Sequence, residues 1–316
     1  MSLRVENLRV YYRTLRGNVQ ALDGVTFRVE DGEIMGVAGE SGCGKTTLSK
    51  SLIRLDGRMQ YIEGTVELDG ERLPVDKQEE MNNFRYTRVS IIPQYAMSAM
   101  MPIRKIGKMI SELLGSRGYD YQTILPELRR RIELVGLPEN VLDRYPIELS
   151  GGMKQRMVMV ISTLLNPSLL IADEVTSALD VSTQKAVAEA LVEFRDREFV
   201  KSMIVVTHDI SLVYQIADTI LVMYAGKLAE KASTDVIVDS PLHPYTQLLI
   251  SSLPEVGVRY ADKQLGGIPG SPPQLLNPPK GCRFRDRCPL AFDKCVEEPP
   301  FVEVAPGHSV ACWKVN

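Results

Sequence analysis

Apolar and polar residues alternate along the first thirty positions of the chain. Apolar side chains recur at every second or third position on both sides of the turn-like Arg16-Gly17-Asn18, and similar spacing returns at 64–70. A period of two is typical of strands that bury one face. The pattern therefore predicts antiparallel strands over residues 3–30 and one strand of a further hairpin at 64–70.

Four other segments contain short runs that are apolar throughout. They lie at 34–38 and within 88–94, 168–174 and 203–209. Such runs are typical of strands that are covered on both faces, as in parallel sheets. From about 103 to 165, in contrast, apolar residues recur every three or four positions, as in amphipathic helices. We expect an α/β core with an antiparallel β flank and a helical insert.

The segment Gly39–Thr47 fits a phosphate-binding template of one glycine, four free positions and then Gly-Lys-Ser/Thr. It follows the apolar run at 34–38 and precedes a helical pattern at 46–55. Glycines let consecutive backbone N–H groups converge on an anion. Lys45 would then reach the β- and γ-phosphates, and Thr46 would ligate Mg²⁺. The alternative is a glycine-rich turn with a chance Gly-Lys-Thr.

Polar side chains follow the other apolar runs where those strands are expected to end. These side chains are Gln94, the adjacent Asp173 and Glu174, and His208. Two carboxylates at the end of an apolar strand are costly unless a cation or a reaction uses them. Asp173 suits a magnesium shell, and Glu174 suits a general base. Taken alone, the two carboxylates are also consistent with a solvated turn, and His208 with a structural role.

A second anion-ready helix start is predicted at Leu149–Arg156, where a serine and two glycines precede a long helical pattern. Taken alone, this segment is better interpreted as an ordinary capped helix.

Composition narrows the functional class. The chain has 316 residues, 44% of them hydrophobic, and a formal net charge of -3, which argues against a strongly basic nucleic-acid binder. No apolar run approaches the roughly 18–20 residues that span a bilayer, and the first residues lack a signal-peptide pattern. We expect an intracellular protein that would serve a membrane only as a peripheral partner.

Together these motifs resemble those of ABC-transporter ATPase subunits, in kind and in order, over roughly residues 3–235. They are Gly39–Thr47, Gln94, Leu149–Arg156, Asp173-Glu174, Ser177–Asp180 and Val205–Asp209. The resemblance implies a P-loop NTPase fold with a RecA-like core. The core with its antiparallel β subdomain would comprise residues 1–95 and 166–235, the helical subdomain residues 96–165, and a C-terminal extension residues 236–316.

The resemblance also implies a role for each matching residue. Two such subunits sandwich two ATP molecules, and the Leu-Ser-Gly-Gly segment of one subunit closes the site on the other. The implied nucleotide contacts are Gly39, Ser41, Gly42, Gly44, Lys45, Thr46 and Thr47, with Ser150, Gly151 and Gly152 on the opposite subunit. Thr46, Gln94 and Asp173 arrange Mg²⁺ and water, Glu174 is the catalytic carboxylate, His208 contacts the γ-phosphate, and Asp180 connects the two halves.

The strand pattern and the family resemblance predict different roles for Tyr12. An aromatic residue in a strand is more often simple packing. Counting back from Ala21–Gly24, however, Tyr12 occupies the position where the family places its adenine-stacking aromatic. We therefore expect Tyr12 to stack on the adenine ring.

The tail resembles oligopeptide and dipeptide transporter subunits in Ser240–Leu249 and in Ile268–Pro273. His243 and Pro244 predict the start of a helix, and a structural contact there is preferred to a catalytic role for the histidine. Residues 266–281 contain five prolines and predict an irregular strap over the surface.

Four of the five cysteines, Cys282, Cys288, Cys295 and Cys312, lie within the last 35 residues. Their spacings of five, six and sixteen intervening residues lack the Cys-x₂-Cys knuckle usual for structural zinc. Some of the peptide-transporter relatives carry a [4Fe–4S] cluster, and four thiolates suit one. The cluster is the leading expectation, with Zn²⁺ or free structural thiols as alternatives and His308 as a neighbouring donor. Cys43 is separate and fills a permissive position in the phosphate loop.

The chain departs from the family pattern at two places. Val175 replaces the usual proline after the catalytic carboxylate, which would loosen that turn. Residues 95–102 are methionine-rich where the relatives touch their membrane partner, so the permease could differ.

The resemblance implies an ATPase that energises di- or oligopeptide import at the cytoplasmic face of the inner membrane. Its partners would be a second, related or identical ATPase, two transmembrane permease subunits and an extracellular binding protein, with no nucleic acid. The alternatives are nickel or oligosaccharide import, a soluble non-transport ABC ATPase acting on ribosomes or DNA, and a redox-sensing regulator.

Overall fold

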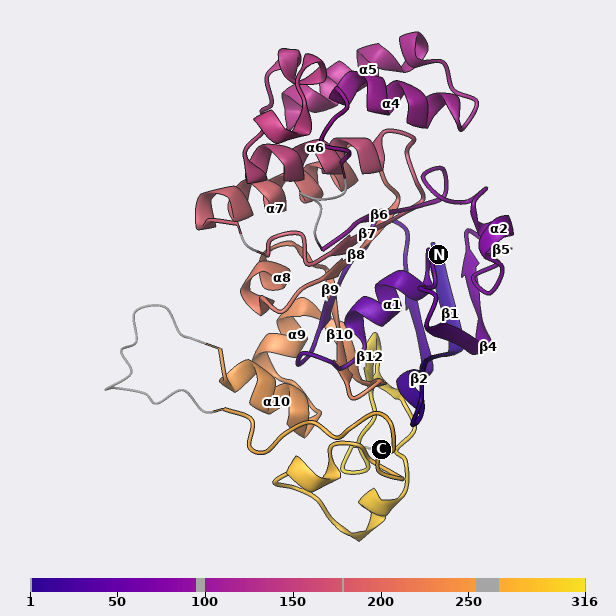
Figure 1. Ribbon diagram of the computed structural model, residues 1–316. Coiled ribbons are helices and arrows are strands. Elements are labelled where there is room, and N and C mark those ends of the chain that lie inside the picture. The colour runs from indigo at the N-terminus through magenta and orange to yellow at the C-terminus, as the bar shows by residue number, and fades with distance from the viewer. Residues whose placement is uncertain (1, 95–99, 178, 254–266, 316) are drawn as a thin grey trace.

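Two β-sheets form the centre of the protein in the computed structural model, which describes residues 2–94, 100–177, 179–253 and 267–315 (Figure 1). The larger sheet has the strand order β11-β12-β10-β9-β3-β8-β7-β6. Its strands are β3 (Ile34–Ala38), β6 (Val89–Ile92), β7 (Leu169–Asp173), β8 (Ser202–Val206), β9 (Thr219–Tyr224), β10 (Lys227–Ser233), β11 (Val302–Ala305) and β12 (His308–Val310).

Neighbours from β9 through β3, β8 and β7 to β6 are parallel, whereas the pairs that involve β10, β11 and β12 are antiparallel. The strands β3, β7 and β8 are buried along their whole length, as their apolar composition predicted. The last two strands come from the C-terminal extension, whose contribution to this sheet was not anticipated.

The smaller sheet is the predicted antiparallel flank. Its order is β2-β1-β4-β5, built from β1 (Leu3–Thr14), β2 (Gly17–Val29), β4 (Met59–Leu68) and β5 (Glu71–Arg72). One hydrophobic cluster joins it to the larger sheet and to the helix α1 (Lys45–Ser51). The functional loop before α1 is therefore fixed between two sheets rather than attached to one.

A group of helices fills the region where helical periodicity was predicted. It comprises α4 (Ile106–Gly115), α5 (Tyr121–Leu134) and α6 (Gly151–Thr163), with short 3₁₀ turns at Glu139–Asp143 and Pro146–Glu148. In Figure 1 these helices lie at one end of the molecule, next to α7 (Val181–Asp196). The remaining α-helices of the described chain are α2 (Gln78–Met81), α8 (Ile210–Ile216), α9 (Thr234–Asp239) and α10 (Pro244–Ser251).

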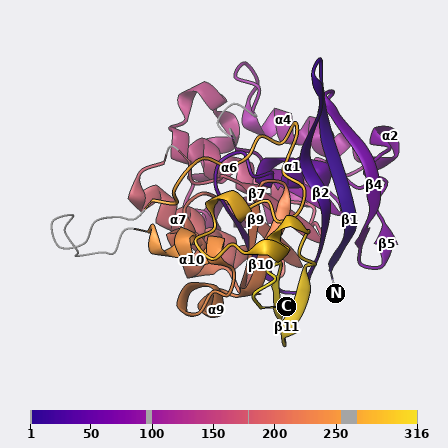
Figure 2. The same ribbon diagram turned by 90° about the horizontal axis from the view of Figure 1, so that it is seen from below.

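The C-terminal extension lies at the opposite end and crosses over β9 and β10 in Figure 2. As predicted, His243 begins a helix: its buried ring is the N-cap of α10, and its Nδ1 accepts a hydrogen bond from the Tyr245 N–H at 3.0 Å. Residues 267–281 form no helix or strand, as expected of a strap. No helix among the described residues is both long and apolar enough to cross a bilayer.

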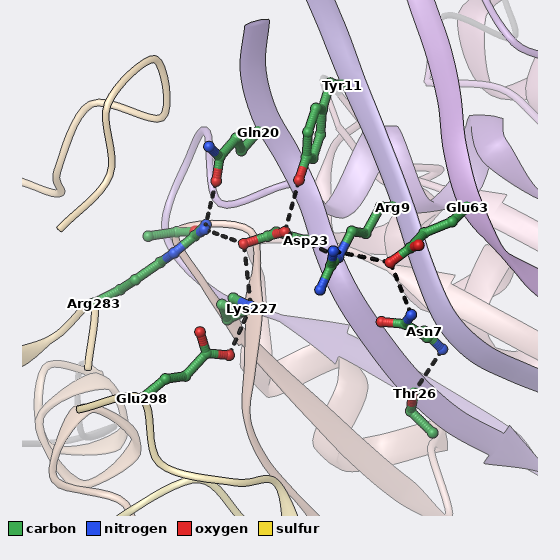
Figure 3. Close-up of polar contacts among 11 residues, drawn as sticks. Asn7, Arg9, Tyr11, Gln20, Asp23, Thr26, Glu63, Lys227, Arg283 and Glu298 are labelled. Carbon is green, nitrogen blue, oxygen red and sulfur yellow. Dashed lines mark hydrogen bonds and ion pairs between the residues drawn. The ribbon is translucent and has the colours of Figure 1, made fainter. Parts of the chain in front are cut away.

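Polar contacts fasten this extension to the smaller sheet (Figure 3). Arg283 donates hydrogen bonds to Asp23 at 2.5 Å and to Gln20 at 3.1 Å, and Tyr11 donates to the other carboxylate oxygen of Asp23 at 2.8 Å. Burial, together with the hydrogen bond to Asp23, raises the pKa of Tyr11 to about 12. The extension is therefore bound to β2, the strand that pairs with the Tyr12-bearing β1, and is not a free tail.

Candidate functional site

The phosphate loop, Gly39–Thr47, connects β3 to α1. Gly39 has a φ of 146°, and a Cβ on it would lie 2.2 Å from the carbonyl oxygen of Met223. Gly44 has a φ of 113°, and its Cβ would lie 2.4 Å from the carbonyl oxygen of Ala21. Since neither contact can relax without moving backbone, these two positions require glycine.

Lys45 lies inside the curve of this loop. Its side chain is buried, and Nζ donates hydrogen bonds to the carbonyl oxygens of Gly39 at 2.6 Å and Glu40 at 3.1 Å. Next to it, Thr47 Oγ1 donates to the hydroxyl oxygen of Tyr12 at 3.4 Å. The loop therefore presents a lysine ammonium and has an aromatic ring beside the helix that follows it.

The three polar strand ends meet as the sequence predicted. Gln94 Nε2 donates a hydrogen bond to Glu174 Oε2 at 2.6 Å, and Ser177 Oγ donates to the same oxygen at 3.2 Å. His208 Nδ1 lies 3.8 Å from Glu174 Oε1. Glu174 itself has a φ of 48°, while its N–H remains bonded to Val206 O at 2.7 Å. The strained left-handed conformation at the end of β7 turns this carboxylate toward the ends of the neighbouring strands.

Asp173 is buried beside this cluster, and its Oδ1 has no hydrogen-bond partner among the described residues. Burial, and then the negative charge of Glu174, raises the pKa of Asp173 to about 6, against the opposing charges of Lys50 and Lys45. An unpaired buried carboxylate oxygen is expensive, and a cation would relieve that cost. The site therefore fits a magnesium ion held in part by Asp173.

The helix start at Ser150 and the residue Asp180 form a second cluster. Ser150 accepts a hydrogen bond from the Met153 N–H at 3.3 Å, and Asp180 accepts from the Thr183 N–H at 3.0 Å. A Cβ on Gly152 would lie 2.9 Å from Thr183 Cγ2, which places α6 against α7. In the part of the chain that the structure describes, no hydrogen bond or ion pair links this cluster to the phosphate loop.

All four C-terminal cysteines line one small cavity, together with His243, Phe284 and Trp313. Burial raises the pKa of Cys282 to about 11, and it also raises those of Cys288 and Cys312, so that these groups are thiols in the absence of a metal. Within the described ranges, no three His, Cys, Asp or Glu side chains form a group able to hold a metal ion. The metal at these cysteines therefore stays a prediction.

Several contacts were not visible in the sequence. His308, expected near the cysteines, instead bonds through Nε2 to the buried Glu230 of β10 at 2.7 Å, and His243 lines the cysteine cavity. Tyr245 and Arg287 reach the phosphate loop. No motif spacing indicates these contacts, because the two residues that form each hydrogen bond are 78 to 247 positions apart in the sequence. Of the methionine-rich departure at residues 95–102, residues 95–99 lie outside the described residues, whereas Met100 is buried and Met101 is exposed.

Two family models match the chain, one in its N-terminal part and one mostly in its C-terminal extension. Residues 22–177 match the family model described as ABC transporter, and residues 229–295 match the oligopeptide/dipeptide transporter C-terminal region. The chain is 38% identical to the dipeptide transport ATP-binding protein DppD of Lactococcus lactis, over 99% of this chain and 91% of the relative. It is 36% identical to the oligopeptide transport ATP-binding protein OppD of Escherichia coli, over 99% and 93%.

Solved structures agree on the fold. A dimeric ATP-binding cassette bound to ADP and Pi superposes with a TM-score of 0.63 at 23% identity, covering 73% of this chain and 98% of the other. A subunit of an ABC transporter complex from Clostridium perfringens superposes with a TM-score of 0.64 at 21% identity, covering 76% and 91%. Both structures support the assignment of the chain to this fold.

The pKa of Asp173 predicts how the stability of the nucleotide-free protein depends on pH. Between about 4 and 6 the folded protein keeps a proton on Asp173 that the unfolded chain has lost, so its free energy of unfolding falls as pH rises through that range. Asp173→Asn removes the free-energy cost of ionising this buried carboxyl group. We expect it to stabilise the protein by about 1–3 kcal/mol at pH 7.5 in EDTA and to have little effect near pH 4.

Denaturant unfolding at the two pH values measures this difference. Glu189→Gln is the control, because it removes the charge of a side chain that is 66% exposed. Equal effects of Asp173→Asn at both pH values would show that the carboxylate carries no burial penalty.

Proposed function

The chain belongs to the ABC-transporter ATPases that carry the oligopeptide/dipeptide-transporter C-terminal region, and on this basis we propose that it energises the uptake of di- or oligopeptides. The observation that carries the ATP-hydrolysing part of the proposal is the convergence of Gln94, Glu174 and His208. They meet at the edge of the larger sheet where β3 leads into the phosphate loop. Such convergence serves phosphoryl transfer, which depends mainly on positioning and charge neutralisation.

The phosphate loop would hold the triphosphate. Lys45 would exchange its bonds to the carbonyls of Gly39 and Glu40 for bonds to the β- and γ-phosphates, and the ring of Tyr12 would stack on the adenine. The residues assigned to the phosphates are Gly39, Ser41, Gly42, Gly44, Lys45, Thr46 and Thr47. The requirement for glycine at Gly39 and Gly44 supports this assignment, because it keeps the loop curved around the lysine.

Hydrolysis would use the cluster at the strand ends. Glu174 would accept a proton from the attacking water, Gln94 would orient that water, and His208 would contact the γ-phosphate. When bound, Mg²⁺ supplies charge neutralisation at the phosphates, and Thr46, Gln94 and Asp173 would hold it. The unpaired Oδ1 of Asp173 supports its place in that set.

A second cassette would complete the site. Ser150, Gly151 and Gly152 would face the phosphates of the partner chain, and Asp180 would connect the halves. Among the described residues no hydrogen bond or ion pair joins this helix start to the phosphate loop of its own chain, which supports a role toward the ATP of a docked partner. Catalysis would then depend on closure, which allows ATP binding to perform mechanical work.

The other partners would be two transmembrane permease subunits and, through them, an extracellular substrate-binding protein, with no nucleic acid. The chain would bind peripherally at the cytoplasmic face of the inner membrane. We retain the three units predicted above: the ATPase core at 1–95 and 166–235, the helical subdomain at 96–165, and the C-terminal extension at 236–316. The helical group α4–α6 and the strap support this division.

The four C-terminal cysteines would hold a [4Fe–4S] cluster, with Zn²⁺ as the alternative. All four thiols line one cavity, and the N–H groups of Phe284, Leu290 and Lys314 oppose the burial that raises the pKa of Cys282, Cys288 and Cys312, respectively. The described residues form no group able to hold a metal ion as they stand, which favours neither metal over the other. A bound cluster would cross-link the extension.

Glu174→Gln tests the catalytic assignment. The amide keeps the size of the side chain but cannot accept the proton, so we expect unchanged ATP binding and a loss of turnover of at least about a hundredfold. Equilibrium nucleotide binding and phosphate release measure the two effects, and Glu189→Gln is the control for a lost surface charge. Near-normal hydrolysis by Glu174→Gln would remove Glu174 from the role of base.

Isolation from native membranes tests the transport assignment. A tagged chain, extracted in mild detergent, is expected to bring down polytopic membrane proteins and a second ABC ATPase. Mass spectrometry of the isolated complex identifies them. Recovery of ribosomal proteins or DNA-bound proteins in place of permeases would instead favour the non-transport alternative.

Metal analysis under exclusion of oxygen tests the cysteine site. We expect about four iron atoms per chain and a broad visible absorption that bleaches on reduction. Cys295→Ser should remove both signals, whereas Cys43→Ser, outside the cavity, should keep them. Stoichiometric zinc without iron would show that the site is a zinc site.

A further inference from the structure

Glu40, the second residue of the phosphate loop, is bound by the C-terminal extension. Arg287 donates two hydrogen bonds to its carboxylate, from Nη1 at 2.6 Å and from Nη2 at 3.0 Å. The Arg287 side chain is 5% exposed and the Glu40 side chain 25%. A two-point contact between a planar guanidinium and a carboxylate fixes orientation as well as distance, and burial shields it from solvent.

A second group of the extension holds the backbone of the same residue. The Glu40 N–H donates to the hydroxyl oxygen of Tyr245 at 2.8 Å. Tyr245 is fully buried in α10, and its ring centroid lies 4.6 Å from that of Tyr224 and 5.4 Å from that of Phe284. Packed aromatic rings of this kind leave the hydroxyl little freedom to move.

Glu40 in turn shapes the loop around the lysine. Its carbonyl oxygen accepts hydrogen bonds from Lys45 Nζ at 3.1 Å and from the Cys43 N–H at 3.2 Å. The side chain, N–H and carbonyl of one residue therefore connect the extension to the ammonium group that would meet the phosphates. A displacement of Glu40 would shift the carbonyl next to Lys45.

Arg287 is itself held by the extension. It lies in a 3₁₀ turn, Arg285–Arg287, directly before Cys288, and it donates further hydrogen bonds to Pro269 O at 2.8 Å and to Tyr224 OH at 3.1 Å. The hydrogen bond to Glu40 raises the pKa of Arg287 further above its ordinary value. Its position is thus set by the strap, by the cysteine-bearing segment and by Tyr224 at the end of β9.

We propose that Arg287 and Tyr245 are positioning residues for ATP, which hold Glu40 so that the phosphate loop keeps its nucleotide-binding curve. The C-terminal extension thereby sets the affinity of a site to which it contributes no nucleotide ligand. This inference rests on the proposed assignment of Gly39–Thr47 to the phosphates.

Removing the contact should weaken ATP binding without disabling the chemistry. For Arg287→Gln and for Glu40→Gln we expect the KM and the Kd for ATP to rise about tenfold, with kcat within about twofold of the parent. Tyr245→Phe, which deletes only the hydroxyl, should raise the Kd in the same direction. Arg287→Lys should restore only part of the affinity, because an ammonium cannot make the two-point contact.

Arg285→Ala is the matched control. Arg285 lies in the same turn but pairs with its neighbour Asp286 at the surface, so its loss should leave the Kd unchanged. The double variant Arg287→Gln/Glu40→Gln distinguishes an effect through the Arg287–Glu40 contact from separate effects of the two residues. If the pair acts on the loop, the double variant should bind ATP no more weakly than either single variant.

Two outcomes distinguish this inference from the proposed function. Loss of nucleotide binding in Lys45→Ala, with unchanged Kd in folded Arg287→Gln and Glu40→Gln, would overturn the inference and leave the site assignment intact. Additive losses in the double variant would also overturn it, since they would mean that the two residues act separately. Unchanged binding in Lys45→Ala would overturn the site assignment itself.

Discussion

The candidate site depends on the parallel order of four adjacent strands. Because β3, β8, β7 and β6 run in the same direction side by side, their carboxyl ends lie along one edge of the sheet. The groups that follow those ends are therefore brought together although they are spread over residues 39 to 208 of the chain. Parallel α/β sheets generally form their ligand sites at this edge.

This arrangement concentrates negative charge, which has an energetic cost. Two consecutive carboxylates end β7, one with an unpaired buried oxygen and the other in a left-handed backbone conformation. Neither feature helps the nucleotide-free fold. A cation held by Asp173 would offset the cost of its unpaired oxygen.

The C-terminal extension binds the ATPase through apolar side chains in the main core, through pairing of β12 with β10, and through polar groups. Arg283 reaches Asp23, Arg287 reaches Glu40, and His308 reaches the buried Glu230. Such contacts are specific in geometry, since a buried carboxylate that loses its partner is costly. A segment too short and proline-rich to bury a large core of its own thus reaches the phosphate loop at Glu40.

The sequence by itself determined the strands β1 to β4 and β6 to β8, the helical region, the phosphate loop and the residues at the strand ends, because each is encoded by local periodicity or by short motifs. Val175 illustrates a departure of small consequence, since Glu174 still meets Gln94 and His208. Only the tertiary structure decided that the extension adds strands to the main sheet, that His308 pairs with Glu230, and that Arg287 and Tyr245 hold Glu40. These contacts join residues up to 247 positions apart, and a hydrogen bond between such partners leaves no periodic trace in either segment.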